Sequence, residues 1–113
     1  MDDCIFCKII KKDIQSTVVY EDTNTFAFRD IHPQASTHIL VVPKKHISSI
    51  EDVPSQDQTI NQIFDSIKKI AKQEKINDTG YRVVVNKGAD AGQAVFHLHF
   101  HIIGGKRLSD RMV

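Results

Sequence analysis

The sequence lacks the strong net charge, the long apolar runs and the signal-peptide pattern that would assign it to a specialised class of protein. Its formal net charge at pH 7 is only +1, which gives no electrostatic basis for binding a nucleic-acid polymer or an anionic membrane. No apolar run is long enough to span a bilayer, and the start, Met1-Asp2-Asp3, has no signal-peptide pattern. We therefore expect a cytoplasmic protein without a membrane partner, in which any phosphate ligand is held by local contacts.

Cysteine is also scarce, since Cys4 and Cys7 are the only two in the chain. In a reducing compartment they are not expected to form a structural disulfide. Their Cys-x-x-Cys spacing leaves metal binding, redox chemistry, or a pair of buried thiols with no chemical role. A zinc site would need two further ligands from elsewhere in the chain.

The length and the hydrophobic pattern indicate a single domain over residues 1–113, short enough that a partner subunit would add useful burial. Strand patterns occur at 18–21, 25–29, 38–42, 81–85 and 94–103, and helical patterns at 4–11 and 60–71. Ser55 and Gln58 predict a capping box at the start of the long helix, and 77–80 predict its end. We expect the α+β class: a mostly antiparallel sheet of about five strands, one long helix and a short N-terminal helix.

Three of the six histidines lie on alternate positions of one apolar segment, at 97, 99 and 101. In a strand such residues project from the same face, while Phe96, Leu98, Phe100 and Ile102 would supply the buried face. Neighbouring histidines would be roughly 7 Å apart along the strand, which makes one metal shared by all three unfavourable. Two could chelate a metal, or all could be unrelated core and surface residues. A division of labour, with one ring reacting and its neighbours binding or transferring protons, suits the row better.

The loop before these histidines, residues 86–93, contains Gly88 and Gly92 among small side chains. Such a loop lets backbone N–H groups approach an anion, although a tight hairpin loop needs glycines too. Next to three imidazoles it favours a phosphate ligand. A neutral imidazole is a competent nucleophile for nucleotidyl transfer, and a protonated neighbour can stabilise charge or protonate a leaving group.

The segment His97-Leu98-His99-Phe100-His101-Ile102-Ile103 matches the His-φ-His-φ-His-φ-φ signature, and the chain resembles the histidine-triad superfamily in its nucleoside phosphoramidase branch. Further matches lie at 5–10, 27–31, 33–35, 37–47, 84–88, 92–93 and 104–105. The resemblance implies cleavage of nucleoside 5′-monophosphate derivatives, such as phosphoramidates or aminoacyl-adenylates, through a covalent nucleotidyl-histidine. It also implies an adenosine-monophosphate-type ligand and a homodimer with one continuous sheet of about ten strands.

The same resemblance assigns roles to individual residues. His99 matches the nucleophile, His101 the residue that contacts the phosphate and assists the leaving group, and His38 a further histidine beside them. The nucleotide-binding positions implied are Phe6, Phe28, Asp30, Ile31, Leu40, Asn86, Gly92, Gln93, Ala94 and Val95, together with His99 and His101. Among these, Asp30 would accept hydrogen bonds from ribose hydroxyls, or it could simply cap a turn before Pro33.

Some members of the superfamily with this cysteine pair bind structural zinc, which implies Cys4, Cys7, His46 and His97 as ligands and no metal in catalysis. Two departures make the leaving-group preference non-transferable: Ala94 replaces a frequent serine, and the tail from residue 106 has no tryptophan. Two alternatives stay open, a nucleotide-binding regulatory protein with incidental hydrolysis and a dinucleoside polyphosphate hydrolase. The Gly104-Gly105 pair argues against the second.

Overall fold

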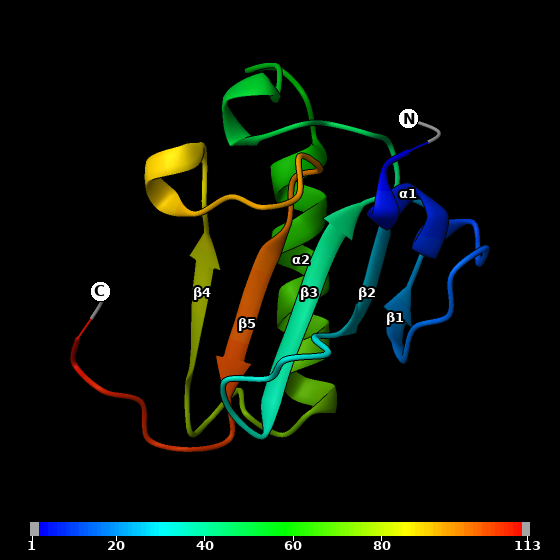
Figure 1. Ribbon diagram of the computed structural model, residues 1–113. Coiled ribbons are helices and arrows are strands. Elements are labelled where there is room, and N and C mark those ends of the chain that lie inside the picture. The colour runs from blue at the N-terminus through cyan, green and yellow to red at the C-terminus, as the bar shows by residue number, and fades with distance from the viewer. Residues whose placement is uncertain (1–2, 112–113) are drawn as a thin grey trace.

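The computed structural model describes residues 3–111; the start on which the signal-peptide expectation depends, Met1 and Asp2, and the last two residues of the tail lie outside the described residues. The elements in chain order are α1 (Ile5–Ile10), β1 (Val18–Glu21), β2 (Thr25–Arg29), β3 (Thr37–Pro43), η1 (Ile50–Asp52), α2 (Thr59–Gln73), β4 (Tyr81–Val85), η2 (Ala89–Ala91) and β5 (Phe100–Gly104) (Figure 1). The expected α+β class is confirmed. Within residues 3–111, no helix has the length and apolar character needed to cross a membrane.

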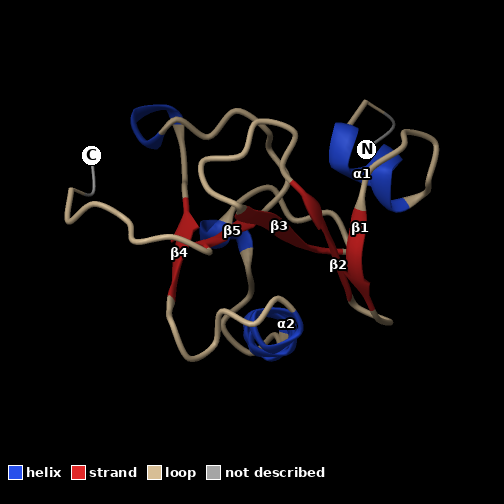
Figure 2. Ribbon diagram, turned by 90° about the horizontal axis from the view of Figure 1, so that it is seen from below, coloured by secondary structure: helices blue, strands red, loops and turns tan. Residues whose placement is uncertain are grey.

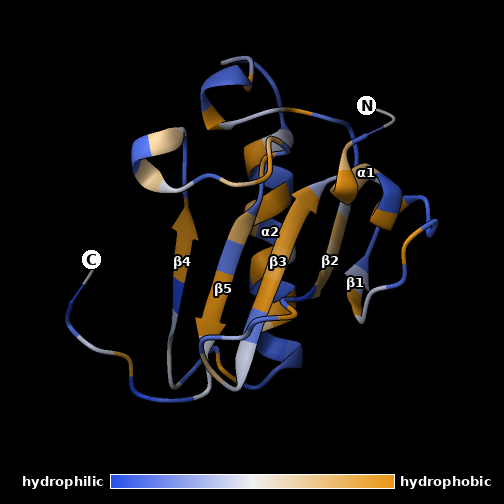
Figure 3. Ribbon diagram, in the orientation of Figure 1, coloured by the Kyte–Doolittle hydropathy of each residue, from blue (hydrophilic) through white to orange (hydrophobic). Residues whose placement is uncertain are grey.

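The five strands form one antiparallel sheet in the order β1-β2-β3-β5-β4. The central strand, β3, is buried at every position and is apolar along most of its length (Figure 3). It ends at Pro43, which has no N–H group to continue a ladder. In the pairing of β3 with β5, Leu40 lies opposite His101 and His38 lies opposite Ile103. This register brings the histidines of the two strands close together.

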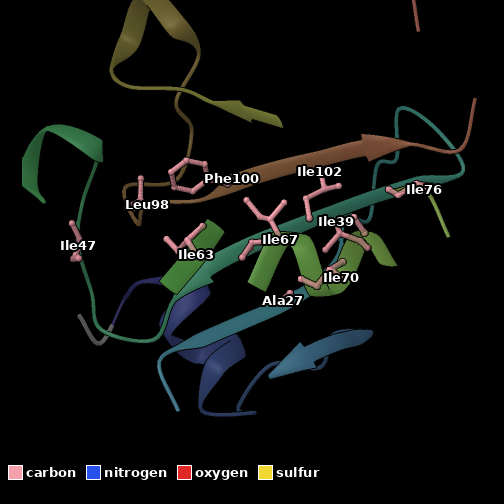
Figure 4. Packing of buried hydrophobic residues seen from close by; sticks show 12 residues of the cluster. Ala27, Ile39, Ile47, Ile63, Ile67, Ile70, Ile76, Leu98, Phe100 and Ile102 are labelled. Atoms are coloured by element: carbon pink, nitrogen blue, oxygen red, sulfur yellow. The ribbon is translucent and has the colours of Figure 1, made fainter. Parts of the chain in front are cut away.

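The two faces of the sheet carry separate hydrophobic clusters. Figure 2 shows α2 on one face and α1 on the other. The α2 face contains Ala27, Ile39, Val41, Ile47, Ile63, Ile67, Ile70, Ala71, Ile76, Leu98, Phe100 and Ile102 (Figure 4). The α1 face contains Phe6, Ile9, Phe26, Phe28, Leu40 and Val42. The long helix therefore supports the sheet from one side, while the short helix leaves part of the other face to polar residues.

The start of α2 differs from the expected capping box. The helix begins at Thr59, with Gln58 at the N-cap and no hydrogen bond from its side chain. The Asp57 carboxylate instead accepts hydrogen bonds from the backbone N–H (2.7 Å) and the hydroxyl of Thr59. Because Asp57 already satisfies a free N–H group of the first turn, Ser55 has no capping role and its prediction is wrong. The helix ends at Gln73, ahead of the expected stop at 77–80.

The histidine segment is only partly a strand. Strand β5 covers Phe100–Gly104, so residues 94–99, expected to continue it, lie outside the ladder. The N–H of Leu98 donates to the carbonyl of Ile47 (2.6 Å), which directs this stretch along the segment after Pro43 rather than along β3. Phe96, expected on the buried face, is 59% exposed, whereas Leu98, Phe100 and Ile102 are buried as predicted.

Candidate active site

His99 lies directly before β5, on the α1 face of the sheet. Its ring is perpendicular to that of Phe6, with centroids 5.1 Å apart, and lies 5.3 Å from the ring of His101. Its Nδ1 atom is 2.8 Å from the carbonyl oxygen of His97. Because a carbonyl oxygen only accepts, Nδ1 of His99 carries the proton, and Nε2 of the neutral ring keeps its lone pair. This tautomer is the one that a nucleophilic imidazole at Nε2 needs.

His38 and His101 form a hydrogen-bonded pair. A backbone N–H group determines which nitrogen of each ring carries the proton. The N–H of Gln34 donates to Nδ1 of His38 (3.0 Å), so neutral His38 carries its proton on Nε2. That Nε2–H faces Nδ1 of His101 at 2.9 Å. His101 accepts at Nδ1 and therefore presents an Nε2–H group as a donor. The backbone contact of Gln34 has no signature in the sequence and was missed there.

The electrostatic surroundings keep both rings neutral in the free protein. Burial, with the neighbouring His99 and His38, lowers the pKa of His101 from 6.5 to about 4. Burial also lowers the pKa of His38, and the carboxylate of Asp30 opposes this. At pH 7 the pair is thus a hydrogen-bond relay, and an anion bound at Nε2 of His101 would raise its pKa.

The residues expected around the base and ribose lie partly together. Phe6, Phe28 and Leu40 belong to the α1-face cluster, with Val95 packed against it, and the rings of Phe6 and Phe28 meet edge to face at 5.5 Å. This apolar wall adjoins the ring of His99. Ile31, also expected there, is 85% exposed and lies in the loop after β2.

Asp30 lies at the start of that loop. One carboxylate oxygen accepts the N–H of His32 (2.8 Å), and the other lies 3.4 Å from Nε2 of His38. Its side chain keeps 18% exposure, and a carboxylate has lone pairs beyond these contacts for a ligand. The turn role considered from the sequence and a ligand role are therefore compatible.

The side chain of Gln93 holds the loop of residues 86–93, which was expected to bind phosphate, through hydrogen bonds. Its side-chain amide donates to the carbonyls of Ser48 (2.9 Å) and Val95 (3.2 Å), and its side-chain oxygen accepts the N–H of Gly88 (2.9 Å). Its own N–H donates to the carbonyl of Gly88 (3.0 Å). Gly88 and Gly92 adopt φ values of 85° and 77°, which favour glycine. The polar groups of Gln93 are thus used in shaping the loop, a role that sequence reasoning missed.

The loop ends differ in exposure. Asn86, at the end of β4, is half-buried, while Gly92 and Ala94 are exposed. Because Ala94 has no hydroxyl, it offers only its backbone groups to a ligand. Any contact of the loop with phosphate would therefore come mainly from backbone N–H groups and from Asn86.

Cys4, Cys7, His46 and His97 form a second cluster, in which one ligand atom of each lies within 4.8 Å of the others. Nδ1 of His97 is 3.5 Å from Sγ of Cys4 and 3.6 Å from Sγ of Cys7, and Nδ1 of His46 is 3.4 Å from Sγ of Cys7. Tetrahedral zinc with usual bond lengths separates sulfur and nitrogen ligands by about 3.6 Å. These three distances therefore suit zinc, and the two thiols and two imidazoles are donor types that zinc prefers.

A backbone carbonyl fixes the orientation of the His97 ring. Its Nε2 lies 2.8 Å from the carbonyl oxygen of Pro43, so Nε2 donates and the lone pair of Nδ1 faces the thiols. Burial and the neighbouring Cys4 raise the pKa of the Cys7 thiol, which a divalent cation would reverse. A cavity of about 390 Å³ lies beside the cluster and is lined in part by Cys4, His46 and Phe96. His97 itself is fully buried, and His32, without an expected role, is exposed.

The chain matches known proteins over almost its whole length. The HIT domain family model matches residues 11–108. A purine nucleoside phosphoramidase from Escherichia coli (strain K12) is 43% identical over 108 residues, which cover 95% of this chain and 91% of that protein. A histidine triad protein from Clostridium difficile has a TM-score of 0.95 at 49% identity, covering 98% of this chain and 97% of the other. A HIT family hydrolase from Legionella pneumophila gives 0.92 and 46%, covering 95% and 96%. The chain therefore belongs to the HIT domain family.

Proposed function

We propose that the protein is a hydrolase that releases a nucleoside 5′-monophosphate, with adenosine as the expected nucleoside, from an amine or another leaving group. The observation that carries the proposal is the fixed tautomer of His99, whose Nδ1–H donates to the carbonyl of His97 and whose Nε2 is left as a nucleophile. The names of the Escherichia coli relative, a purine nucleoside phosphoramidase, and of the Legionella pneumophila hydrolase support it.

The reaction proceeds in two displacements at the α-phosphorus. Nε2 of His99 forms a bond to phosphorus while the bond from phosphorus to the leaving nitrogen breaks, and the departing amine takes a proton from Nε2 of His101. Water then forms a bond to phosphorus, the phosphorus–His99 bond breaks, and the proton from water returns to His101. The sum is substrate plus water giving nucleoside monophosphate plus amine.

The ligand would lie along the α1 face. The apolar wall of Phe6, Phe28 and Leu40 suits a base, and the carboxylate of Asp30 can accept from ribose hydroxyls. The loop shaped by Gln93 would supply backbone N–H groups to the phosphate. Since nothing in this wall reads the edge of a base, the preference for a purine depends on the relatives alone.

We also propose a structural Zn²⁺ held by Cys4, Cys7, His46 and His97. The support is the three sulfur–nitrogen distances of 3.4 to 3.6 Å among the four side chains and the orientation of His97. The ion would tie α1 to the segments after β3 and before β5. In this role the ion would contribute stability, and the chemical steps would remain with His99 and His101.

A homodimer through the β4 edge completes the proposal. Strand β4 is one edge of the sheet, and its Val83 is 41% exposed. On α2, the aromatic ring of Phe64 is 48% exposed. The other edge, β1, has an irregular register between Val18 and Tyr20, a feature that protects edges from pairing. Pairing of two β4 strands would give one continuous sheet.

The test is a product assay over adenosine 5′-phosphoramidate, an aminoacyl-adenylate and a dinucleoside polyphosphate. We expect turnover of the first two and, in a His99→Asn variant, loss of turnover with nucleoside monophosphate binding nearly intact, because the nucleophile acts only in the chemical step. Activity of the variant within about tenfold of the wild type would refute the mechanism. Binding without turnover would identify a regulatory protein, and preference for the third substrate a dinucleoside polyphosphate hydrolase.

A further inference from the structure

The carboxylate of Asp30 lies beside the pair formed by His38 and His101. Its Oδ2 atom is 3.4 Å from Nε2 of His38, and the same Nε2 is 2.9 Å from Nδ1 of His101. The three side chains offer ligand atoms within 4.8 Å of one another. The single proton on Nε2 of His38 thus has two acceptors close by, an imidazole nitrogen and a carboxylate oxygen.

The proton count of the pair explains why the second acceptor matters. In the neutral state each ring carries its proton on Nε2. If His101 gives that proton to a leaving group and both rings are to end neutral, the pair must first take up one more proton. The N–H of Gln34 blocks Nδ1 of His38, so the extra proton sits on Nδ1 of His101.

With Nδ1 of His101 protonated, two N–H groups would face each other across the 2.9 Å contact. The Nε2–H of His38 then needs another acceptor, and Oδ2 of Asp30 is within reach after a small turn of the ring. The carboxylate also balances the added positive charge in a site where His38 is only 4% exposed.

The charged and titratable groups around the His38–His101 pair also indicate that Asp30 stabilises the protonated pair. His99 lies beside His101 and disfavours a positive charge there, as burial does. Asp30 is the group that raises the pKa of both His38 and His101. No other residue of the described chain is found to act on both rings in this direction.

We propose that Asp30 is a positioning residue for acid catalysis: it accepts the Nε2–H of His38 when the His38–His101 pair holds its extra proton, and so enables His101 to protonate the leaving group. This inference deepens the proposed function and rests on it. It gives Asp30 a task distinct from contact with ribose.

The experiment compares the wild type with Asp30→Asn, which keeps an oxygen to accept the N–H of His32. Single-turnover release of the leaving group is measured for two substrates. One is an adenosine 5′-phosphoramidate, whose leaving group is an amine, and the other is the p-nitrophenyl ester of adenosine 5′-monophosphate. The amine needs a proton to depart and the nitrophenolate does not. Both substrates carry the same ribose, and the enzyme is used at saturating concentration, so a lost ribose contact affects both rates alike. We expect Asp30→Asn to lower the rate with the phosphoramidate at least tenfold more than the rate with the ester, a part of the roughly 10²–10⁴-fold that acid catalysis contributes.

The pH profile of release gives a second measurement. Because the pair must hold its extra proton, the rate falls at high pH, and Asp30→Asn should move this falling limb to lower pH by roughly one unit or more. Asp30→Glu, which keeps the charge, should recover part of the amine rate. Equal losses for the two substrates with an unmoved limb would reduce Asp30 to a ribose contact and overturn the proposal.

Histidine ¹⁵N NMR of the unliganded protein makes the outcome independent of turnover. In the wild type His38 must be the Nε2–H tautomer, and in Asp30→Asn the pKa of His101 must fall. An Nδ1–H tautomer of His38, or an unchanged pKa of His101, overturns the proposal even if the variant is inactive. Absence of wild-type turnover with both substrates would instead count against the proposed function, while the NMR result stands by itself.

Discussion

Replacement of both cysteines by serine tests whether the cluster of Cys4, Cys7, His46 and His97 binds zinc. Serine keeps the size of the side chain but is a poor zinc ligand. Three of the sulfur–nitrogen distances in the cluster are 3.4 to 3.6 Å, which matches tetrahedral zinc at about 3.6 Å. Binding should therefore need little reorganisation, and its free energy should add to the stability of the fold.

The expected magnitude follows from mass action. Free Zn²⁺ at 100 times its dissociation constant stabilises the native state by about 2.7 kcal/mol. In a chain of 113 residues this corresponds to roughly 10 °C in Tm, at about 4 °C per kcal/mol. We expect the double variant to melt about that much lower in zinc-buffered solution, with a smaller change in turnover per folded molecule.

Scanning calorimetry and elemental analysis of protein purified without chelator are the measurements. His32→Ala is the matched control, because His32 is exposed and outside the cluster, and it should keep both zinc content and Tm. Well under one zinc per chain in the wild type, with no gain in Tm on adding Zn²⁺, would mean that the cysteines are ordinary thiols.

Three further predictions follow from the same contacts. A 2′,3′-dideoxy nucleotide should bind tens-fold more weakly than the ribonucleotide, since an unpaired Asp30 costs roughly 1–3 kcal/mol; equal affinities would leave Asp30 without a ribose role. Sedimentation equilibrium at micromolar concentration should give a dimer that Val83→Lys dissociates, and a 12.8 kDa wild-type species would contradict this. Because the folded state lowers the pKa of His101 from 6.5 to about 4, the unfolded chain binds more protons in this interval. Unfolding free energy should therefore be retained above pH 6.5 and fall toward pH 4, with a shallower slope in His101→Asn.

Much of the fold could be predicted because the alternation of hydrophobic and polar side chains in the sequence shows which positions are buried. The runs at 18–21, 25–29 and 81–85 are strands with the expected bounds, and the β3 run extends by one residue at each end. The start of α2 was harder to predict, because Asp57 and Ser55 both have capping side chains and the choice between them depends on the path of the preceding loop.

The sequence predicts which side chains come together at the candidate site, but it does not predict the tautomers of the histidines. The alternation of histidines and the cysteine spacing indicate the candidate side chains, and the structure brings His38 beside His101 and the four candidate zinc ligands together. The tautomers depend on main-chain atoms, the carbonyls of Pro43 and His97 and the N–H of Gln34. Every residue type has a carbonyl and every type except proline has an N–H, so no sequence pattern indicates these atoms.

The stereochemical course at phosphorus tests the covalent role of His99 most directly. A substrate made chiral at the α-phosphorus by sulfur and oxygen isotopes is hydrolysed, and the configuration of the released nucleoside monophosphorothioate is determined. Each in-line displacement inverts the phosphorus, so attack by His99 followed by attack of water gives net retention. Retention, together with a transient adduct on His99 in quenched mass spectra, is the predicted result. Net inversion would mean that water attacks directly, and would contradict the nucleotidyl-histidine mechanism.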